Sequence, residues 1–368
     1  MSMLNEVNRR PITDTKDRSF LGRIRDIVPW KGDSPKEIIR KTVFIVSVGV
    51  LIYWCYTAYI YFMGSKTMIN DHKELSELYN NSTSDQSATD NIGDNSPLQT
   101  TDVNTQGNTV SDQPAIQPHR LSRFDELYAI NPDIVGWLRI DGIYLEDTDE
   151  LAIDYPIVQT TDNDYYLEKD FFGEKQDYGA LFADYRANLT GIGRSSNVTI
   201  YGHNMKTEYY FHHLRDYNRV SPSFVSDHRL IDFSTLYSED QYIIIGCFYV
   251  SVNEEDDNQP LFAYHNCVDF NNDAEFDYWY KNVMYRNYYL TDIDCNINDE
   301  YLTLSTCAFE ISDSRFVVVS RKLRPGEDPS VYTYESNPDR HMPEKWYKAN
   351  GKKVPVDDGP DYEYYVPE

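Results

Sequence analysis

The stretch YLTLSTCAFEISDSRFVVVSRKL, residues 301–323, contains two strand-like runs separated by a seven-residue loop, AFEISDS. Side chains alternate between the two faces of a strand, so residues two apart share a face. If the two runs pair as an antiparallel hairpin closed by that loop, Cys307 lies opposite Arg315. Directly opposed residues have Cβ atoms about 5 Å apart. The pattern therefore predicts a thiol beside a guanidinium group.

A thiol in this position has two interpretations. Next to an arginine, Cys307 would be favoured as a thiolate, and Arg315 would also donate hydrogen bonds to an oxyanion formed on an attacked carbonyl. Alternatively, Cys307 is a small buried apolar residue, as free cysteines commonly are, and Arg315 is a surface residue of a strand. The spacing alone leaves both open.

His203 is the candidate base for such a thiol. It follows the apolar run NVTIY, residues 197–201, at a strand-to-loop exit that contains Gly202. Glycine permits backbone angles that would turn the imidazole away from the sheet. A histidine near its ordinary pKa can accept the thiol proton and return it to a leaving amine. Among the other histidines, His212 and His213 are adjacent on a predicted helix and do not converge on a metal, and His265 lies in an irregular insertion.

Strand-like runs dominate the region around these residues. They lie at residues 152–159, 179–184, 197–202, 241–250, 301–306 and 315–323. Helices are expected at residues 121–131, 206–217 and 274–285, and Asn131-Pro132 is interpreted as the start of a further helix. No βαβ unit repeats. The fold class predicted is mainly β, a barrel or sandwich with helical insertions.

The N-terminal part predicts a membrane anchor. Residues 42–63 carry no charge over 22 positions, and a helix of that length spans about 33 Å, enough for a bilayer core. Residues 1–41 hold ten Lys/Arg against six Asp/Glu, which places the N-terminus in the cytoplasm and the rest outside the cell. A cleaved signal peptide fits less well, because the apolar run is long and begins far from Met1.

Composition divides the chain into five expected segments. These are a cytoplasmic basic segment (1–41), a transmembrane anchor (42–64), a flexible extracellular stalk (65–118), a catalytic domain (119–323) and an acidic C-terminal extension rich in Tyr and Pro (324–368). The chain has a net charge of −26, which disfavours nucleic-acid binding and is compatible with simple solubility.

The five cysteines do not form a CxxC pair, so zinc sites and thioredoxin-like sites are disfavoured. Disulfides and free thiols both remain open for the cysteines of the body. We expect no metal site and no cofactor.

Three strings, TIYGHNM (199–205), TLSTC (303–307) and SRFVVVSRKL (314–323), resemble in that order the active-site signatures of class B sortases, the membrane-anchored cysteine transpeptidases of Gram-positive bacteria. The upstream blocks FDELYAINPDIVGWLRIDG, IDYPIVQTTDNDYYLEKDFFG and GALFADYRAN are similar to segments that precede the histidine strand in that class. The insertion at residues 251–287 resembles the helix-bearing loop of the class. The resemblance covers residues 120–323.

The resemblance implies a sortase-type closed β-barrel and assigns roles residue by residue. His203 matches the catalytic histidine, Cys307 the nucleophile and Arg315 the arginine. Around them, the implied substrate-pocket and oxyanion residues are Ser305, Thr306, Ala308 and Asn204.

The implied reaction is cleavage of a C-terminal sorting motif of a surface protein at a Thr carbonyl through a thioester. The acyl group then passes to an amine of a peptidoglycan precursor or a pilin lysine. Two alternatives stay open: a hydrolytic cysteine peptidase that uses the same residues, and a non-enzymatic, membrane-tethered binding module in which Cys307 is a core residue.

Overall fold

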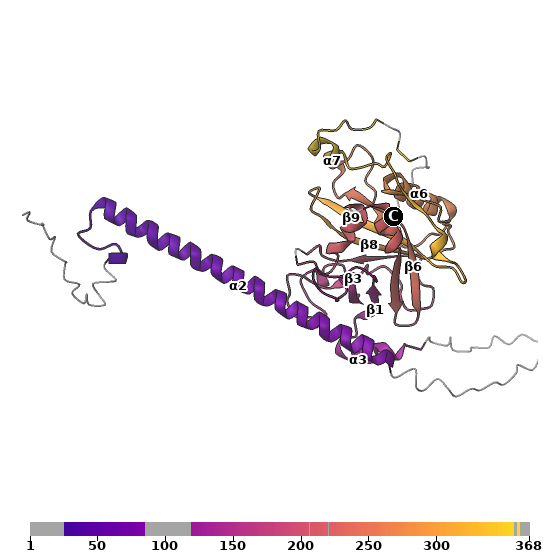
Figure 1. Ribbon diagram of the computed structural model, residues 1–368, viewed down its shortest axis with the longest axis horizontal. Coiled ribbons are helices and arrows are strands. Elements are labelled where there is room, and N and C mark those ends of the chain that lie inside the picture. The colour runs from indigo at the N-terminus through magenta and orange to yellow at the C-terminus, as the bar shows by residue number, and fades with distance from the viewer. Residues whose placement is uncertain (1–25, 85–118, 206, 220, 357–358, 361–368) are drawn as a thin grey trace, which may run out of the picture. The chain divides into compact units, whose positions relative to one another are not determined.

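The computed structural model describes residues 26–84, 119–205, 207–219, 221–356 and 359–360. The chain divides into two compact units at Ile69/Asn70. In the first unit, the long helix α2 (Pro35–Ser84) begins. The second unit contains all the strands of the described chain (Figure 1).

Eight strands of the second unit close into a barrel with the order β1-β2-β3-β4-β8-β9-β6-β5. Their bounds are β1 Ile134–Arg139, β2 Asp154–Val158, β3 Leu181–Ala183, β4 Asn197–Tyr201, β5 Leu230–Thr235, β6 Glu239–Ser251, β8 Tyr301–Ala308 and β9 Ser314–Lys322. A small separate sheet pairs β7 (Tyr289–Thr291) with β10 (Tyr334–Ser336). The expected fold class, a mainly β closed barrel with helical parts, is confirmed.

Within the described chain, five further α-helices belong to this unit, of which α3 precedes β1 and α7 follows β10. They are α3 (Asp125–Ile130), α4 (Asp216–Arg219), α5 (Pro222–Asp227), α6 (Asp273–Arg286) and α7 (Glu344–Ala349). Helix α6 matches the helix expected in the insertion, and its N-cap Asn272 accepts a hydrogen bond from the backbone of Glu275. The strands carry bulky apolar side chains such as Trp137, Phe233 and Phe248, which are almost fully buried.

Two helix predictions were wrong. Within the stretch predicted at 206–217, the described residues 207–217 form only a 3₁₀ turn at His212–Arg215 that leads into α4. Glu208 and Tyr210 adopt positive φ angles of 69° and 58°, which a right-handed helix excludes. Asn131 does not start a helix but caps the end of α3. Its side-chain amide donates to the Tyr166 hydroxyl, and β1 follows at once.

The last turns of α2 belong to the barrel unit. On this stretch His72, Leu75 and Tyr79 are buried, and the Tyr79 ring stacks on Trp137 with centroids 4.2 Å apart and planes at 4°. These three residues are spaced as one face of a helix, three and four positions apart. The expectation of a flexible segment from residue 65 is therefore not met for residues 65–84, which are helical. Residues 85–118 of the expected stalk lie outside the described residues, as do residues 1–25 of the basic segment.

Helix α2 also contains the apolar stretch that suggested a membrane anchor. Between Pro35 and Asn81 it includes an 18-residue window that is long and apolar enough to cross a membrane, and none of that window is buried within the protein. Exposed apolar side chains of this kind are costly in water and favourable in a bilayer.

The C-terminal extension is not irregular throughout. It starts beside β9, where the fully buried guanidinium of Arg321 pairs with Glu327, and this hydrogen bond holds the pKa of Glu327 at about 2. It then adds β10 to β7 and ends in α7. The part from residue 324 to residue 356 is called the strap below. Residues 361–368 lie outside the described chain.

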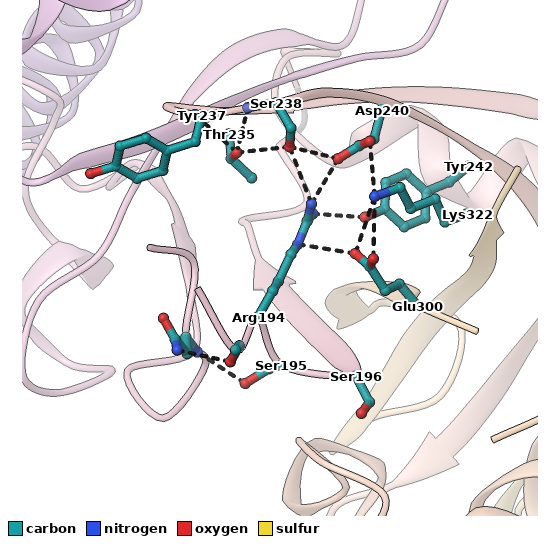
Figure 2. Close-up of polar contacts among 12 residues, drawn as sticks. Arg194, Ser195, Ser196, Thr235, Tyr237, Ser238, Asp240, Tyr242, Glu300 and Lys322 are labelled. Atoms are coloured by element: carbon teal, nitrogen blue, oxygen red, sulfur yellow. Dashed lines mark hydrogen bonds and ion pairs between the residues drawn. The ribbon is translucent and has the colours of Figure 1, made fainter. Parts of the chain in front are cut away.

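A polar network lies beside the first residues of β4 and β8, at the ends of these strands away from Cys307. Figure 2 shows its side chains. The Arg194 guanidinium, ahead of β4, donates to Asp240 at 2.7 Å and to the Tyr242 hydroxyl at 2.7 Å, and it also pairs with Glu300. Lys322 pairs with Asp240 and Glu300 from the far side. Burial alone would raise the pKa of Asp240, but hydrogen bonds from Lys322, Ser238 and Arg194 outweigh burial and lower it.

We expect Arg194→Met to destabilise the folded domain, because the change leaves the half-buried Asp240 and Glu300 with one cation between them. The loss should be about 3 kcal/mol, the cost of removing one partner from a largely buried pair. Thermal unfolding of Arg194→Met should show this, with Arg139→Met on the half-exposed face of β1 as the matched control. An unchanged melting temperature for Arg194→Met would contradict the assigned role of the network.

Candidate active site

The β8–β9 hairpin places Cys307 and Arg315 directly opposite each other, in the register expected from the loop length. The Arg315 Nη1 atom donates to the Cys307 Sγ atom at 2.6 Å. Both side chains are half-buried. A guanidinium N–H at this distance donates a charge-assisted hydrogen bond to the sulfur. The hairpin therefore produces the thiol–guanidinium pair by backbone register alone.

His203 reaches the same region through the parallel pairing of β4 with β8. Tyr201 is the register partner of Ser305, and the chain stays beside β8 for one more residue, since the Gly202 N–H donates to the Ser305 carbonyl. His203 lies two positions after Tyr201, and Cys307 lies two positions after Ser305, the register partner of Tyr201. The His203 Nε2 atom lies 3.0 Å from the Leu167 carbonyl oxygen, and the side chain lines the same cavity as Cys307 and Arg315.

Gly202 has a different structural role from the one expected. Its φ angle is outside the left-handed region. A Cβ atom at this position would collide with the Leu181 side chain and the Phe211 ring. Glycine is therefore needed for the close approach of these side chains to the chain just before His203.

The four residues expected in the substrate pocket and the oxyanion site divide into two groups. Ser305 and Thr306 line the cavity, and both are held: the Ser305 hydroxyl lies 2.6 Å from the Tyr264 hydroxyl, and the Thr306 hydroxyl donates to the Gly202 carbonyl at 2.7 Å. Ala308 and Asn204 do not line it. The Asn204 amide donates to the Cys307 carbonyl at 3.0 Å, so this side chain fixes the backbone of the cysteine.

The cavity has a volume of about 370 Å³ and is mostly apolar. Besides the residues expected from the sequence, its walls include Leu167, Phe182 and Tyr201, and the segments 250–252 and 261–265 of the insertion. Sequence reasoning missed these walls. The one usable signal was the apolar string LFAY at residues 261–264, inside an otherwise acidic insertion.

His265 is a second histidine in the cavity wall, although its sequence context had argued against it. Burial and the nearby Arg186 guanidinium lower the pKa of His265, and Arg315 contributes in the same direction. Burial also raises the pKa of the neighbouring Tyr264 to about 12. Both groups are therefore neutral at pH 7, which leaves Arg315 as the charged donor beside the sulfur.

The other thiols of the barrel unit lie in different surroundings. All five cysteines are unpaired. Burial raises the pKa of Cys247, and it raises the pKa of Cys267 and of Cys295 to about 12. Such thiols are poor nucleophiles at neutral pH. Within the described part of the chain, no group of three or more His, Cys, Asp or Glu side chains is arranged to hold a metal ion.

Comparison with known proteins identifies the family. No family model matches the chain. Over 185 residues the chain is 31% identical to sortase B of Listeria monocytogenes serovar 1/2a, an alignment that covers 50% of this chain and 67% of the relative. The chain belongs to the class B sortases. This class B sortase is also 27% identical over 210 residues to sortase B of Staphylococcus aureus, which covers 56% of the chain and 78% of the relative.

Solved structures agree with the barrel of this sortase. A Staphylococcus aureus sortase B–substrate complex superposes with a TM-score of 0.54 at 24% identity, covering 72% of this chain and all of the other. Sortase B from Bacillus anthracis gives a TM-score of 0.51 at 24% identity, covering 72% and 99%. At this identity the likeness concerns the fold. The chain is therefore a member of a cysteine transpeptidase family with the barrel of that family.

Proposed function

We propose that this sortase cleaves a C-terminal sorting motif of a surface protein at a Thr carbonyl and transfers the acyl group to an amine. Cys307 is the nucleophile, His203 the general acid and base, and Arg315 the oxyanion donor. The amine comes from a peptidoglycan precursor or a pilin lysine.

The steps follow from the positions of the three side chains. The Cys307 sulfur attacks the Thr carbonyl carbon, and the carbonyl oxygen becomes an oxyanion that accepts hydrogen bonds from Arg315, which lines the cavity. The C–N bond then breaks as His203 protonates the departing amine, which leaves a thioester. The acceptor amine attacks the thioester, its proton passes to His203, and the thiolate departs. Nothing in this sequence requires a cofactor.

One observation carries the proposal: Arg315 Nη1 lies 2.6 Å from Cys307 Sγ inside a mostly apolar cavity that His203 also lines. A sulfur in such a cavity has a charge partner, a proton acceptor and a surface for an extended peptide. Ser305 and Thr306 would contact the bound motif from the floor of the cavity.

The proposed location follows from helix α2. Residues 42–64 cross the cell membrane once and contact lipid, the basic N-terminal segment is cytoplasmic, and the catalytic domain is extracellular. Tethering of enzyme and substrate to one membrane raises their effective concentration, which offsets weak peptide affinity.

The test is a peptide-library cleavage assay with mass spectrometry, with and without a primary amine such as triglycine. We expect a thioester adduct on the protein and, with amine, a product longer by the added nucleophile. Release of the free acid alone, even at high amine concentration, would identify a hydrolytic peptidase. Absence of any adduct or cleavage would favour a binding module and overturn the proposal.

A further inference from the structure

The strap (residues 324–356) runs from β9 toward the cavity and is fixed along its course. After the Arg321–Glu327 pair, the Tyr334 hydroxyl donates to the Ile244 carbonyl at 2.6 Å in a buried contact. Further along, the backbone N–H of His341 donates to the Tyr285 carbonyl at 2.9 Å. The strap is thus attached to the barrel and to α6 before it reaches the insertion.

The segment that the strap reaches forms one wall of the cavity. Residues 252–263, here called the acidic loop, include Val252, Leu261 and Phe262 of the cavity lining. The same loop carries four consecutive carboxylates at residues 254–257. Like charges so close repel one another, so a defined loop conformation needs cations beside it.

The strap supplies partners to three consecutive residues of the acidic loop. His341 Nε2 lies 2.8 Å from Asp257 Oδ1, with side chains 1% and 4% exposed, and its ring stacks on Tyr285 at 4.8 Å. Lys345 Nζ lies 3.2 Å from Asp256 Oδ2. The Asn258 amide donates to a strap carbonyl, that of Pro355, at 3.2 Å.

Lys345 makes a second ion pair, with the turn that precedes β9. Its Nζ atom lies 3.3 Å from Asp313 Oδ2, in the turn between β8 and β9. Asp313 is two residues before Arg315, and its carbonyl accepts a hydrogen bond from the Val252 N–H at 2.9 Å. One ammonium group therefore joins the acidic loop to the turn that connects Cys307 with Arg315.

We propose that the strap is a substrate-positioning element, in which Lys345 and His341 hold the acidic loop as a preformed wall for the sorting peptide. This inference rests on the proposed transpeptidase function. Neither residue lines the cavity, so both are positioning residues and not catalytic ones. A preformed wall lowers the entropic cost of binding an extended peptide. Loss of the ion pairs between the strap and the acidic loop should therefore weaken peptide binding more than it slows the bond-breaking step.

The experiment uses the full chain in detergent with three single variants. Lys345→Met removes both ion pairs but keeps the length of the side chain. Lys345→Arg keeps the charge. Lys348→Met is the control on the same helix, since Lys348 pairs with Glu344 of α7. For Lys345→Met we expect KM for the sorting peptide to rise about three-fold to ten-fold, the effect of losing two partly exposed ion pairs, with kcat changed less. Amide hydrogen exchange at residues 252–261 should become faster.

Each outcome decides between a positioning role and its absence. The positioning role of the strap is supported if Lys345→Arg restores the wild-type KM and slow hydrogen exchange and if Lys348→Met behaves like the wild type. The proposed positioning role is overturned if Lys345→Met leaves both KM and hydrogen exchange unchanged. It is also overturned if Lys348→Met has an equal effect. A fall in kcat and melting temperature with KM unaltered would overturn it as well. If the wild type cleaves no sorting peptide, the proposed function fails, and the exchange of residues 252–261 still decides whether Lys345 holds the loop.

Discussion

Cys307→Ala is expected to lower peptide cleavage by about 10⁴-fold or more, because no other group in the described cavity can form the thioester. The mass of the protein after incubation with substrate should show no adduct. The fold should be retained, since the side chain is half-buried and the change removes only sulfur.

Cys295→Ala is the matched control for this substitution. Cys295 is also unpaired and only partly exposed, but it lies outside the cavity, and burial raises its pKa to about 12. Its replacement should leave both the adduct and the rate unchanged. A Cys307→Ala variant that still turned over sorting peptide would require another nucleophile and would remove the basis of the mechanism.

Arg315→Lys is expected to reduce kcat by about 10²- to 10³-fold, the usual loss when an oxyanion donor is removed. An ammonium group is a single point charge and cannot donate to the sulfur and to an oxyanion at once with the planar fork of a guanidinium. Single-turnover acylation, followed by mass spectrometry, measures this step directly.

Arg139→Lys on β1 serves as the control, because Arg139 is a partly exposed strand arginine that pairs with Asp141 at the surface. It should acylate at the normal rate. Near-normal acylation by Arg315→Lys would mean that Arg315 supplies charge but no directed hydrogen bond.

The pairing of Cys307 with Arg315 was accessible from the sequence, because strand alternation and a short loop leave few registers. The walls of the cavity were not. Residues 261–265 reach it only through tertiary contacts of the insertion, for which no local periodicity exists. The prediction of a helix at 206–217 was wrong because Glu208 and Tyr210 adopt positive φ angles, which residue type alone does not indicate.

The end of α2 was missed for another reason. The long charge-free run drew attention to residues 42–63, while the spacing of His72, Leu75 and Tyr79 marks a buried helical face that continues beyond it. The face is buried because it packs on Trp137, which is distant in the chain and stacks on Tyr79.

That stacking changes how the polar stretch 85–118 can serve the protein. Residues 70–84 on one side of it and residue 119 on the other belong to the same folded unit, so the stretch connects two parts of one unit and does not link two units. A secreted version that starts at residue 119 would instead bare the indole of Trp137 and self-associate, whereas one starting near residue 70 would stay monodisperse.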